Sequence, residues 1–319
     1  MLTVLFATRN RACQLADVLA AYERLEPPAG GWRLVVTDNG STDGTRDVLD
    51  AFAGRLPLTS LFEGTPGKNA ALTTGLSAVA GDLVVFTDDD VFPRPSWLPR
   101  LRAAADQNPS FAIFGGVVLP RWEVPPPDWI LTWVPLGPVF TLTNPAIADG
   151  PTGSQNIYGP NMAIRTEVLA ANQGFDPTIG PRGRDYAMGS ETELVRRLLR
   201  RGYTAWYTRG AVVEHFIRAA QMRRSWILER AILFGRGQYR LARGEDRARP
   251  EPHAWGGVPR YLIREMLEHA LSAVAGAISF NARRVFQARW RFNYVRGQAL
   301  EARTLSRGAR PHRIEATAQ

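Results

Sequence analysis

Short hydrophobic segments alternate with amphipathic segments along the first 90 residues. The hydrophobic segments are rich in β-branched and aliphatic residues, which is typical of buried strands. They lie at residues 2–8, 32–37, 58–64 and 82–88. The segments between them carry apolar residues three or four positions apart, which predicts helices at 14–25, 45–56 and 68–81. This alternation of strands and helices indicates an α/β fold with a parallel, doubly wound sheet.

Polar residues follow three of the predicted strands at the point where each strand ends. Thr8, Asn10 and Arg11 follow the first strand, Asp38 and Asn39 follow the second, and three aspartates at 88–90 follow the fourth. In such sheets the loops at the carboxyl ends of the strands form the ligand crevice. We therefore expect these three clusters to line one binding site. Either Ser41 or Thr42 is expected to cap the helix that begins at residue 45.

The chain changes character after residue 90. Residues 120–158 are rich in Pro and Trp, which predicts a long loop with little regular structure that faces an acceptor. The regular segments expected beyond it are a strand and a helix within 159–176, a helix at 191–202, a strand pair or sheet edge at 204–216, and helices at 219–244 and 258–306. We expect one domain over residues 1–217 and a helical extension over residues 218–319, with a linker near residues 243–258.

The net charge of +9 is unevenly distributed. Residues 1–217 hold 19 basic and 22 acidic residues, whereas residues 218–313 hold 20 basic and 7 acidic residues. Solvated helix faces account for such a distribution, and so does a surface that meets anionic lipid, a phosphorylated acceptor or nucleic acid.

Two absences narrow the class of protein. Cys13 is the only cysteine, which excludes a disulfide framework and a Cys-based zinc site. The first ten residues do not resemble a signal peptide, and no apolar run approaches the roughly 18–20 residues that span a bilayer. We expect a cytoplasmic protein that is soluble or peripheral at the inner face of the cell membrane.

Three adjacent aspartates at 88–90 repel one another unless a cation lies against them. Carboxylates at a strand end suit a hard divalent cation, Mg²⁺ or Mn²⁺, whose coordination substrate phosphates complete. The alternative is a cluster that caps a helix. Val91, Phe92 and Pro93, which come next, are a poor helix beginning, so the metal site is favoured.

Other polar residues allow both a structural and a chemical interpretation. Asp38 and Asp43 form a turn, or they accept hydrogen bonds from a base or ribose. Lys68 opens a predicted helix, which is a natural phosphate site. Glu191 matches the dipole of the helix that it begins, or it acts as a general base for a hydroxyl group. His215 is a structural histidine or a ligand.

Taken in order, these motifs resemble the inverting glycosyltransferases of family 2, which have the GT-A fold, a Rossmann-like mixed sheet flanked by helices. The resemblance covers about residues 2–235 and implies a C-terminal helical appendage. The segments that carry it are "VLFATRNR", "VVTDNGSTDGT", "GKNAALTTGL", "FTDDDVFPRPSWL", "GPNMAIRTEVL" and "GSETELVRRLLRRGY".

The resemblance also implies roles for individual residues. It places Glu191 as the catalytic base, although the family commonly has Asp there and Glu is one methylene longer. It places Asp90 and His215 as ligands of Mn²⁺ or Mg²⁺. The residues that it implies for binding of the nucleotide sugar are Thr8, Asn10, Arg11, Asp38, Asn39, Lys68, Asn69, Asp88 and Asp89.

The activity implied is metal-dependent transfer of a sugar, with inversion, from a nucleotide-diphosphate sugar to a hydroxyl group. The donor base is uracil by resemblance, and the acceptor is a saccharide or a lipid-linked molecule in cell-surface polysaccharide or glycolipid synthesis. The residues identify neither the sugar nor the linkage.

Two alternatives come from other classes of protein. A sugar-1-phosphate nucleotidyltransferase would carry a Gly-rich loop after the first strand, and "FATRNRACQ" contains no glycine. A non-catalytic module would dock its basic end on a membrane or on nucleic acid. The segment "ARRVFQARWRFNYVRGQ" at 282–298 suits a helix in a membrane interface. We expect peripheral contact with anionic membrane through the Arg-rich helices, and no nucleic-acid partner.

Overall fold

The computed structural model describes residues 1–181, 183, 186–245 and 254–308. The chain divides into two compact units: the first consists of most of residues 1–222, and the second begins at Arg223 and also includes the short segments 132–134 and 186–188. The predicted domain boundary after residue 217 stays a prediction. The predicted linker near 243–258 falls mainly on residues 246–253, which lie outside the described part of the chain.

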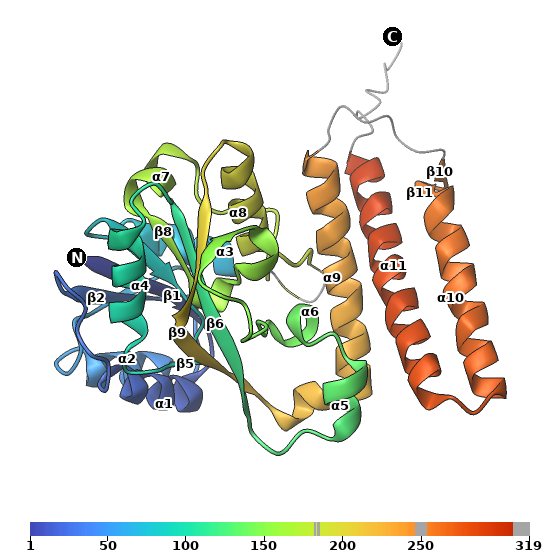
Figure 1. Cartoon of the computed structure of the whole chain (residues 1–319), viewed down its shortest axis with the longest axis horizontal. Helices are drawn as coiled ribbons and strands as arrows, with labels where there is room; N and C mark the ends of the chain where they lie inside the picture. The colour runs from blue at the N-terminus through green and yellow to red at the C-terminus, as the bar shows by residue number, and fades with distance from the viewer. Residues whose placement is uncertain (182, 184–185, 246–253, 309–319) are drawn as a thin grey trace, which may run out of the picture. The chain divides into compact units, whose positions relative to one another are not determined.

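A mixed sheet flanked by helices forms the centre of the first unit (Figure 1). Along the sheet the strands follow the order β3-β2-β1-β4-β8-β6-β9-β5, with β7 paired to β9. The strands are β1 (Leu2–Thr8), β2 (Trp32–Asp38), β3 (Leu58–Phe62), β4 (Leu83–Phe86), β5 (Val91–Pro93), β6 (Ile113–Trp122), β7 (Gly150–Thr152), β8 (Met162–Arg165) and β9 (Ala205–Ile217). The first four strands of this order are parallel, whereas β8 is antiparallel to both of its neighbours. The predicted α/β GT-A architecture is therefore confirmed.

Five predicted helices of the first unit are present with somewhat different bounds: α1 (Ala12–Tyr22), α2 (Thr45–Phe52), α3 (Lys68–Leu76), α7 (Thr166–Ala171) and α8 (Ser190–Arg200). The structure adds helices that were not predicted, α4 (Trp97–Gln107), α5 (Asp128–Trp133) and α6 (Leu136–Phe140). Leu2, Val4, Leu5 and Phe6 of β1 are fully buried, because β1 lies inside the sheet and side chains of both faces are covered.

Three local predictions about this unit were wrong in detail. Neither Ser41 nor Thr42 caps α2; Asp43 instead accepts hydrogen bonds from the backbone N–H and the hydroxyl of Thr45. Residues 120–158 contain the end of β6, α5, α6, β7 and a short 3₁₀ helix at Ser154–Asn156, so this stretch is not a loop with little structure. Three prolines at 125–127 precede α5, where their missing N–H groups cost nothing.

The third correction concerns residues 204–216, which form neither a strand pair nor a sheet edge. β9 is one strand of 13 residues that lies between β6 and β5. The register between β6 and β9 shifts at Gly116, where an added Cβ atom would lie 2.4 Å from the Ala211 carbonyl oxygen. The bulge lets one strand pair with β6 along its length and with β5 near its end, which carries His215 toward Asp90.

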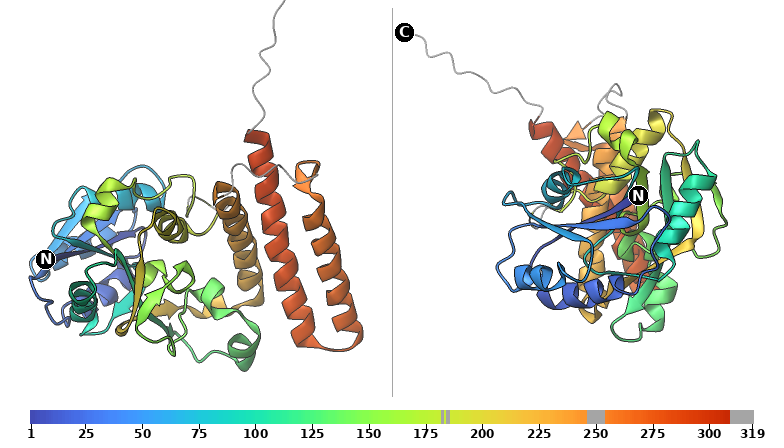
Figure 2. Two further views of the ribbon diagram at one scale, coloured as in Figure 1. Left: turned by 45° about the horizontal axis from the view of Figure 1, so that its top comes forward. Right: turned by 90° about the vertical axis from the view of Figure 1, so that its left-hand side faces the viewer.

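The second unit is built from three long helices, α9 (Arg224–Glu245), α10 (Arg260–Ile278) and α11 (Ala282–Gly308), and a two-stranded ladder of β10 (Ala254–Trp255) and β11 (Val258–Pro259). Figures 1 and 2 show α11 between α9 and α10. The predicted single helix at 258–306 is a helical hairpin, because Phe280 adopts a left-handed φ of 51° and the Asn281 N–H returns to the Gly276 carbonyl.

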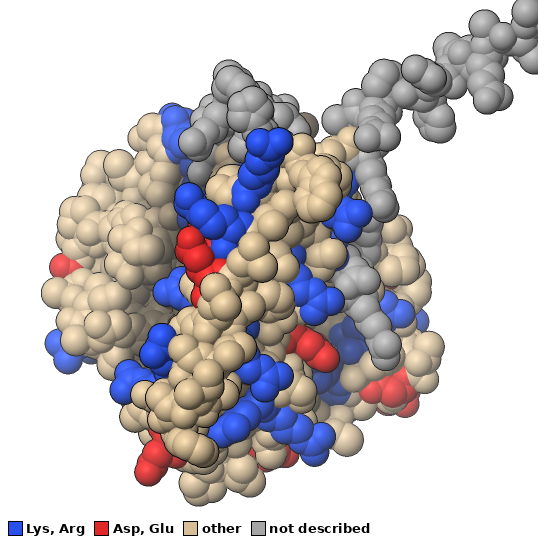
Figure 3. All heavy atoms as spheres, turned by 90° about the vertical axis from the view of Figure 1, so that its right-hand side faces the viewer, with Lys and Arg blue, Asp and Glu red and all other residues tan. Residues whose placement is uncertain are grey.

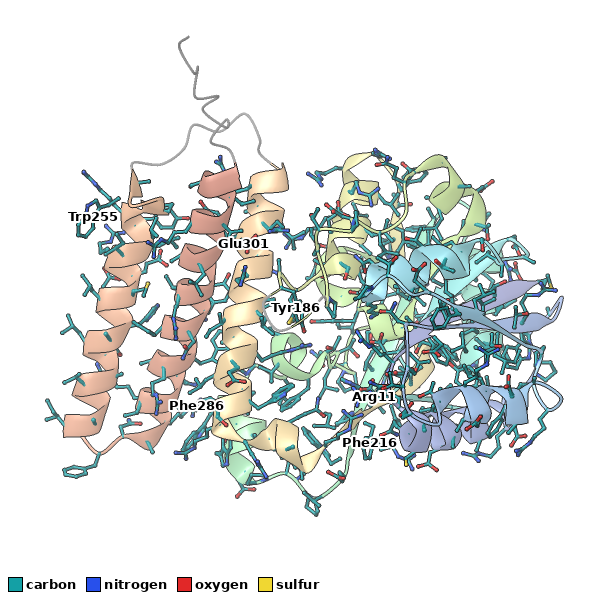
Figure 4. The ribbon with its side chains drawn as sticks, turned by 180° about the vertical axis from the view of Figure 1, so that it is seen from behind. Arg11, Tyr186, Phe216, Trp255, Phe286 and Glu301 are labelled. Carbon is teal, nitrogen blue, oxygen red and sulfur yellow. The ribbon has the colours of Figure 1, made fainter. Side chains whose placement is uncertain are left out.

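A buried carboxylate joins α9 to α11. Glu301 is fully buried and accepts hydrogen bonds from the guanidinium groups of Arg236, at 3.0 Å, and Arg240, at 2.6 Å (Figure 4). The aromatic residues of α11 also point into this unit: Trp290 stacks on Tyr294, and both lie against Phe234 of α9. The apolar side of residues 282–298, predicted to suit a membrane interface, is thus largely occupied by packing on α9.

Candidate active site

The carboxyl ends of β1, β2 and β4 lie side by side, as the sequence predicts. Thr8 and Asp38 are direct neighbours in the register between β1 and β2, and β4 pairs with β1 on its other side. The three aspartates follow β4, and β5 begins directly after them at Val91. The parallel sheet therefore brings the three predicted polar clusters to one edge, where they are joined by residues from α3, α8 and β9.

Asp89 is the member of the aspartate cluster that faces β1. Its carboxylate accepts a hydrogen bond of 2.8 Å from the Thr8 hydroxyl, and the Arg11 guanidinium lies 3.9 Å from it. Burial, together with the neighbouring Asp90 charge, raises the pKa of Asp89 to about 7 against the opposing effect of Arg11. Asp89 thus serves to fix Thr8 and Arg11 at the rim of the site (Figure 4).

Asp90 faces β9 instead. Its backbone carbonyl accepts a hydrogen bond of 2.8 Å from the Phe216 N–H, and its carboxylate lies 3.5 Å from Nε2 of His215. Burial alone would raise the pKa of Asp90, but His215, Arg11 and Arg218 lower it to about 2. Asp90 is therefore an anion in the free protein.

The orientation of the His215 ring fits a metal ligand. Nδ1 lies 2.7 Å from the Phe140 carbonyl oxygen, which can only accept, so Nδ1 carries the proton. Nε2 then directs a lone pair toward the Asp90 carboxylate, and these two groups repel unless a proton or a cation lies between them. Burial lowers the pKa of His215, but Asp90 and the Phe140 carbonyl together raise it. A carbonyl behind the ring is the usual support of a metal-binding histidine.

Asp90 and His215 give one oxygen and one nitrogen ligand. Among the residues that the structure describes, no group of three or more His, Cys, Asp or Glu side chains is arranged to hold a metal ion. Mg²⁺ and Mn²⁺ sites at nucleotides commonly use one or two protein ligands and are completed by phosphate oxygens and water. The donor set therefore fits a divalent ion that binds together with a diphosphate.

Lys68 joins Asp88 to Glu191, the candidate general base. Its ammonium group donates hydrogen bonds to Oδ1 of Asp88, at 2.5 Å, and to Oε1 of Glu191, at 2.6 Å. Burial by itself would lower the pKa of Lys68, but the two carboxylates outweigh it and raise that pKa. Burial likewise opposes ionisation of Glu191, and Lys68 overcomes it and lowers the pKa of Glu191. For Asp88 the effect of burial, with the charges of Glu191 and Asp90, prevails and raises the pKa.

Two residues implied for nucleotide-sugar binding, Asn39 and Asn69, use their side chains in hydrogen bonds within the protein. The side-chain amide of Asn39 donates to the carbonyls of Glu63 and Thr65, and its oxygen accepts from the Gly67 N–H. The amide of Asn69 donates to the carbonyls of Asp176 and Ile179. Asn39 thus holds the loop that leads to Lys68, and Asn69 holds the loop that precedes α8.

Asn10 connects the loops after β1 and β2, and Asp38 holds the second of these loops. Asp38 accepts a hydrogen bond of 2.9 Å from the Ser41 N–H, and Asn10 accepts one of 2.8 Å from the Thr42 N–H. Asn10 adopts a left-handed φ of 52°, which Asn tolerates better than most residues. The two loops therefore form one rigid wall beside the aspartates.

Three residues that matter for this geometry were missed from sequence. Gly159 lies against Glu191, and a Cβ atom there would be 2.7 Å from Cγ of Glu191. Asn161 holds the turn that contains Gly159, since it accepts from the Trp97 indole and donates to the carbonyls of Val117 and Ala211. The segment "GPNMAIRTEVL" entered the sequence analysis only as part of the family resemblance, although its glycine and asparagine were the available signal.

Arg218 is the third missed residue. It follows β9 three residues after His215, and its charge helps to lower the pKa of Asp90. Its Nη2 is buried and makes no hydrogen bond within the described structure. A buried guanidinium nitrogen without a partner is costly and suits an anionic ligand that binds there. In the sequence Arg218 could not be distinguished from the other arginines that follow it.

Comparison with known proteins identifies the class. Residues 3–170 match the model of the Glycosyl transferase family 2, which is more than half of the chain, and the protein belongs to that family. The glucosyl-dolichyl phosphate glucuronosyltransferase of Haloferax volcanii is 23% identical over 173 residues, which cover 53% of this chain and 54% of that protein. The pre-mycofactocin glycosyltransferase of Mycobacterium tuberculosis is 27% identical over 265 residues, 82% of this chain and 52% of that protein. The chain thus spans about half the length of these relatives.

Solved structures show the same fold. A mannosyltransferase from Pyrobaculum calidifontis, in complex with GDP-Man and Mn²⁺, aligns with a TM-score of 0.56 at 19% identity, over 97% of this chain and 76% of its own. Residues 1–349 of TarS from S. aureus, in complex with UDP-GlcNAc, align with a TM-score of 0.51 at 13% identity, over 98% of this chain and 93% of that one. Within the described residues, no helix has both the length and the apolar character needed to cross a membrane.

The packing of Gly159 on Glu191 gives a prediction for this site. Gly159→Ala should destabilise the protein by about 1–3 kcal/mol, because the added methyl group must displace the buried Glu191 side chain. Gly54→Ala is the matched control, since its Cβ atom would meet nothing within 4 Å. Urea unfolding of both variants measures the difference, and a crystal structure of Gly159→Ala should show Glu191 moved from Lys68. Equal stability of the two variants would show that the contact is not tight.

Proposed function

We propose that this protein transfers a glycosyl group from a nucleoside-diphosphate sugar to a hydroxyl group and inverts the anomeric configuration. The observation that carries the proposal is the half-buried chain of hydrogen bonds Asp88–Lys68–Glu191 beside the Asp90–His215 pair. It combines a candidate general base, a cation and a site suited to a divalent ion within one crevice. Family membership favours this function over the nucleotidyltransferase alternative.

Each part of the crevice has a role in donor binding. Asp38 and the loops after β1 and β2 form the wall for the base and ribose, and Asp88 faces the ribose. Lys68, Arg11 and Arg218 supply positive charge for the diphosphate. A divalent ion held by Asp90 and His215 would act as a Lewis acid that offsets the charge developing on the leaving diphosphate.

The Lys68 bridge suggests how the donor prepares the base. In the free protein Lys68 keeps Glu191 ionised but lowers its basicity, because the carboxylate is stabilised by a charge at 2.6 Å. A diphosphate that attracts the Lys68 ammonium would weaken this contact and raise the pKa of Glu191 within its buried setting. Glu191 then accepts the proton of the acceptor hydroxyl while the acceptor oxygen bonds to the anomeric carbon. The bond from that carbon to the diphosphate oxygen breaks on the opposite side.

The donor proposed is a UDP-sugar, and the acceptor is a saccharide or a lipid-linked molecule. The names of the relatives include a transferase for a dolichyl-phosphate-linked sugar, and one structural neighbour binds UDP-GlcNAc. Another neighbour binds GDP-Man, so a guanine donor is the second candidate for the base. A role in cell-surface polysaccharide or glycolipid synthesis is consistent with these acceptors.

Glu191→Gln tests the base. We expect the transfer rate to fall by about 10²–10⁴-fold, since the amide cannot accept the proton, while a nucleoside diphosphate still raises the melting temperature. Glu193→Gln is the control: it lies on the same helix turn but pairs with Arg197 at 2.8 Å. Donor turnover with a panel of UDP-, GDP- and dTDP-sugars gives the rates. If Glu191→Gln kept the wild-type transfer rate, the assignment of Glu191 as the general base would be wrong.

Asp90→Ala tests the metal site. The variant should lose most of the additional thermal stabilisation that Mn²⁺ gives in the presence of a nucleoside diphosphate, because one of two protein ligands is gone. Asp17→Ala, which removes an exposed carboxylate of α1, should keep it. If Asp90→Ala depended on Mn²⁺ or Mg²⁺ as the wild type does, the ion would bind elsewhere.

Arg218→Ala tests the missed arginine. Loss of one charge-assisted hydrogen bond to the diphosphate should weaken donor binding by about 10–100-fold. Stability of the free protein should not fall in proportion, because Nη2 has no partner there to lose. Arg209→Ala removes an exposed arginine of β9 and serves as the control. Calorimetric titration with the nucleoside diphosphate measures both; equal affinities would place Arg218 outside the donor site.

A further inference from the structure

The second unit exposes an unusual row of large apolar side chains on α10. Leu267, Leu271, Val274 and Ile278 are spaced by four, three and four residues and therefore lie on one side of the helix. All four are exposed, and the fraction reaches 75% for Ile278. The opposite side of α10, with the buried Leu262 and Gly276, packs on α11. We refer to these four residues as the α10 stripe.

Aromatic residues lie at both ends of the stripe. Phe280 is 96% exposed at the turn between α10 and α11, where its left-handed backbone ends the helix. Trp255, labelled in Figure 4, is 77% exposed in the ladder that precedes α10. Single exposed apolar residues are ordinary, but a continuous row of this kind marks an interaction surface.

An apolar groove runs beside the stripe between α10 and α11. Its volume is about 610 Å³, and Leu267 belongs to both the groove and the stripe. Met266 and Phe292 line its walls, and Arg296 and Arg303 contribute the charged groups. The stripe and the groove thus form one apolar surface that has arginines at its border.

The charge around this surface is mainly positive, and the acidic residues of α10, Glu265 and Glu268, lie near its N-terminal end, where Glu268 pairs with Arg264. Residues 270–300 contain five arginines and no aspartate or glutamate. All five are exposed, and Arg283 and Arg284 come directly after the Phe280 turn. Figure 3 shows the face concerned, where blue side chains on both sides of an uncharged band outnumber the red ones. A second copy of this chain on the stripe would bring arginines against arginines, which is unfavourable.

We propose that the α10 stripe, with Phe280 at its end, binds the surface of a bilayer that contains anionic lipids. The apolar side chains enter the boundary between headgroups and acyl chains, and the arginines bind the lipid phosphates. The helix lies in the interface and does not cross it, because Arg264 and Glu268 are exposed charged residues of its N-terminal half and its opposite side packs on α11. This differs from the sequence-based expectation, which assigned the membrane contact to residues 282–298.

The test uses the full chain and flotation with vesicles of equimolar phosphatidylcholine and phosphatidylglycerol at low salt. We expect wild-type protein to bind these vesicles more tightly than pure phosphatidylcholine vesicles, and less tightly at high salt. The triple variant Leu271→Ser, Ile278→Ser, Phe280→Ser should lose binding by at least about tenfold. Phe62→Ser, which removes a 62% exposed aromatic residue from β3, should bind as the wild type does.

A second variant tests the charged part. Arg283→Gln with Arg284→Gln should weaken binding to the anionic vesicles by roughly thirtyfold and leave binding to pure phosphatidylcholine nearly unchanged. Circular dichroism confirms that the variants fold, as expected for exposed positions. Failure of the wild type to bind, or equal binding by the triple variant, would overturn the proposal. So would a wild-type dimer in light scattering that the triple variant abolishes. The proposal is independent of the transfer reaction, which none of these outcomes affects.

Discussion

The candidate site depends on one half-buried cation shared by two carboxylates. Lys68 is the only lysine of the chain, and its ammonium group lies within 2.6 Å of both Asp88 and Glu191. Either carboxylate would be costly to hold in this half-buried position without a partner, and the bridge offsets that cost for both. Since Asp88 follows β4 and Glu191 lies in the first turn of α8, the same bridge joins these two segments.

Much of the surrounding structure serves to place these three groups. Asn39 fixes the loop before Lys68, Asn69 fixes the loop before α8, and Asn161 fixes the turn whose Gly159 leaves room for Glu191. The NH₂ groups of these three buried side chains all donate to backbone carbonyls, so they position the chemistry without touching a substrate, although Oδ1 of Asn69 has no hydrogen-bond partner among the described residues. The Asp90–His215 pair is held separately, through the β-bulge that lets β9 reach β5. The Lys68–Glu191 pair and the Asp90–His215 pair are thus held by different parts of the fold.

The elements that local sequence patterns encode could be predicted. Prediction failed for features that depend on a contact between residues far apart in the sequence. The first four strands and the convergence of Thr8, Asp38 and Asp88 followed from periodicity and from the geometry of parallel sheets. The pairing of Lys68 with Glu191 spans 123 residues and has no local signal. In the same way, the sequence of α11 is typical of an amphipathic surface helix, but its aromatic side is covered by α9. The exposed apolar side chains belong to α10 instead. In the sequence Arg218 does not differ from the many other arginines, and only the fold places it near Asp90.

The central claim, that Lys68 is held by Glu191 in the free protein and turns to the donor diphosphate when it binds, is open to a direct measurement. Because the chain has one lysine, protein labelled with ¹³C-lysine gives a single Cε signal in an NMR spectrum. The account predicts a signal distinct from that of an exposed lysine, which moves in Glu191→Gln and moves again when UDP and Mg²⁺ are added to the wild type. A signal typical of a solvated lysine, unchanged by both the substitution and the nucleotide, would contradict it.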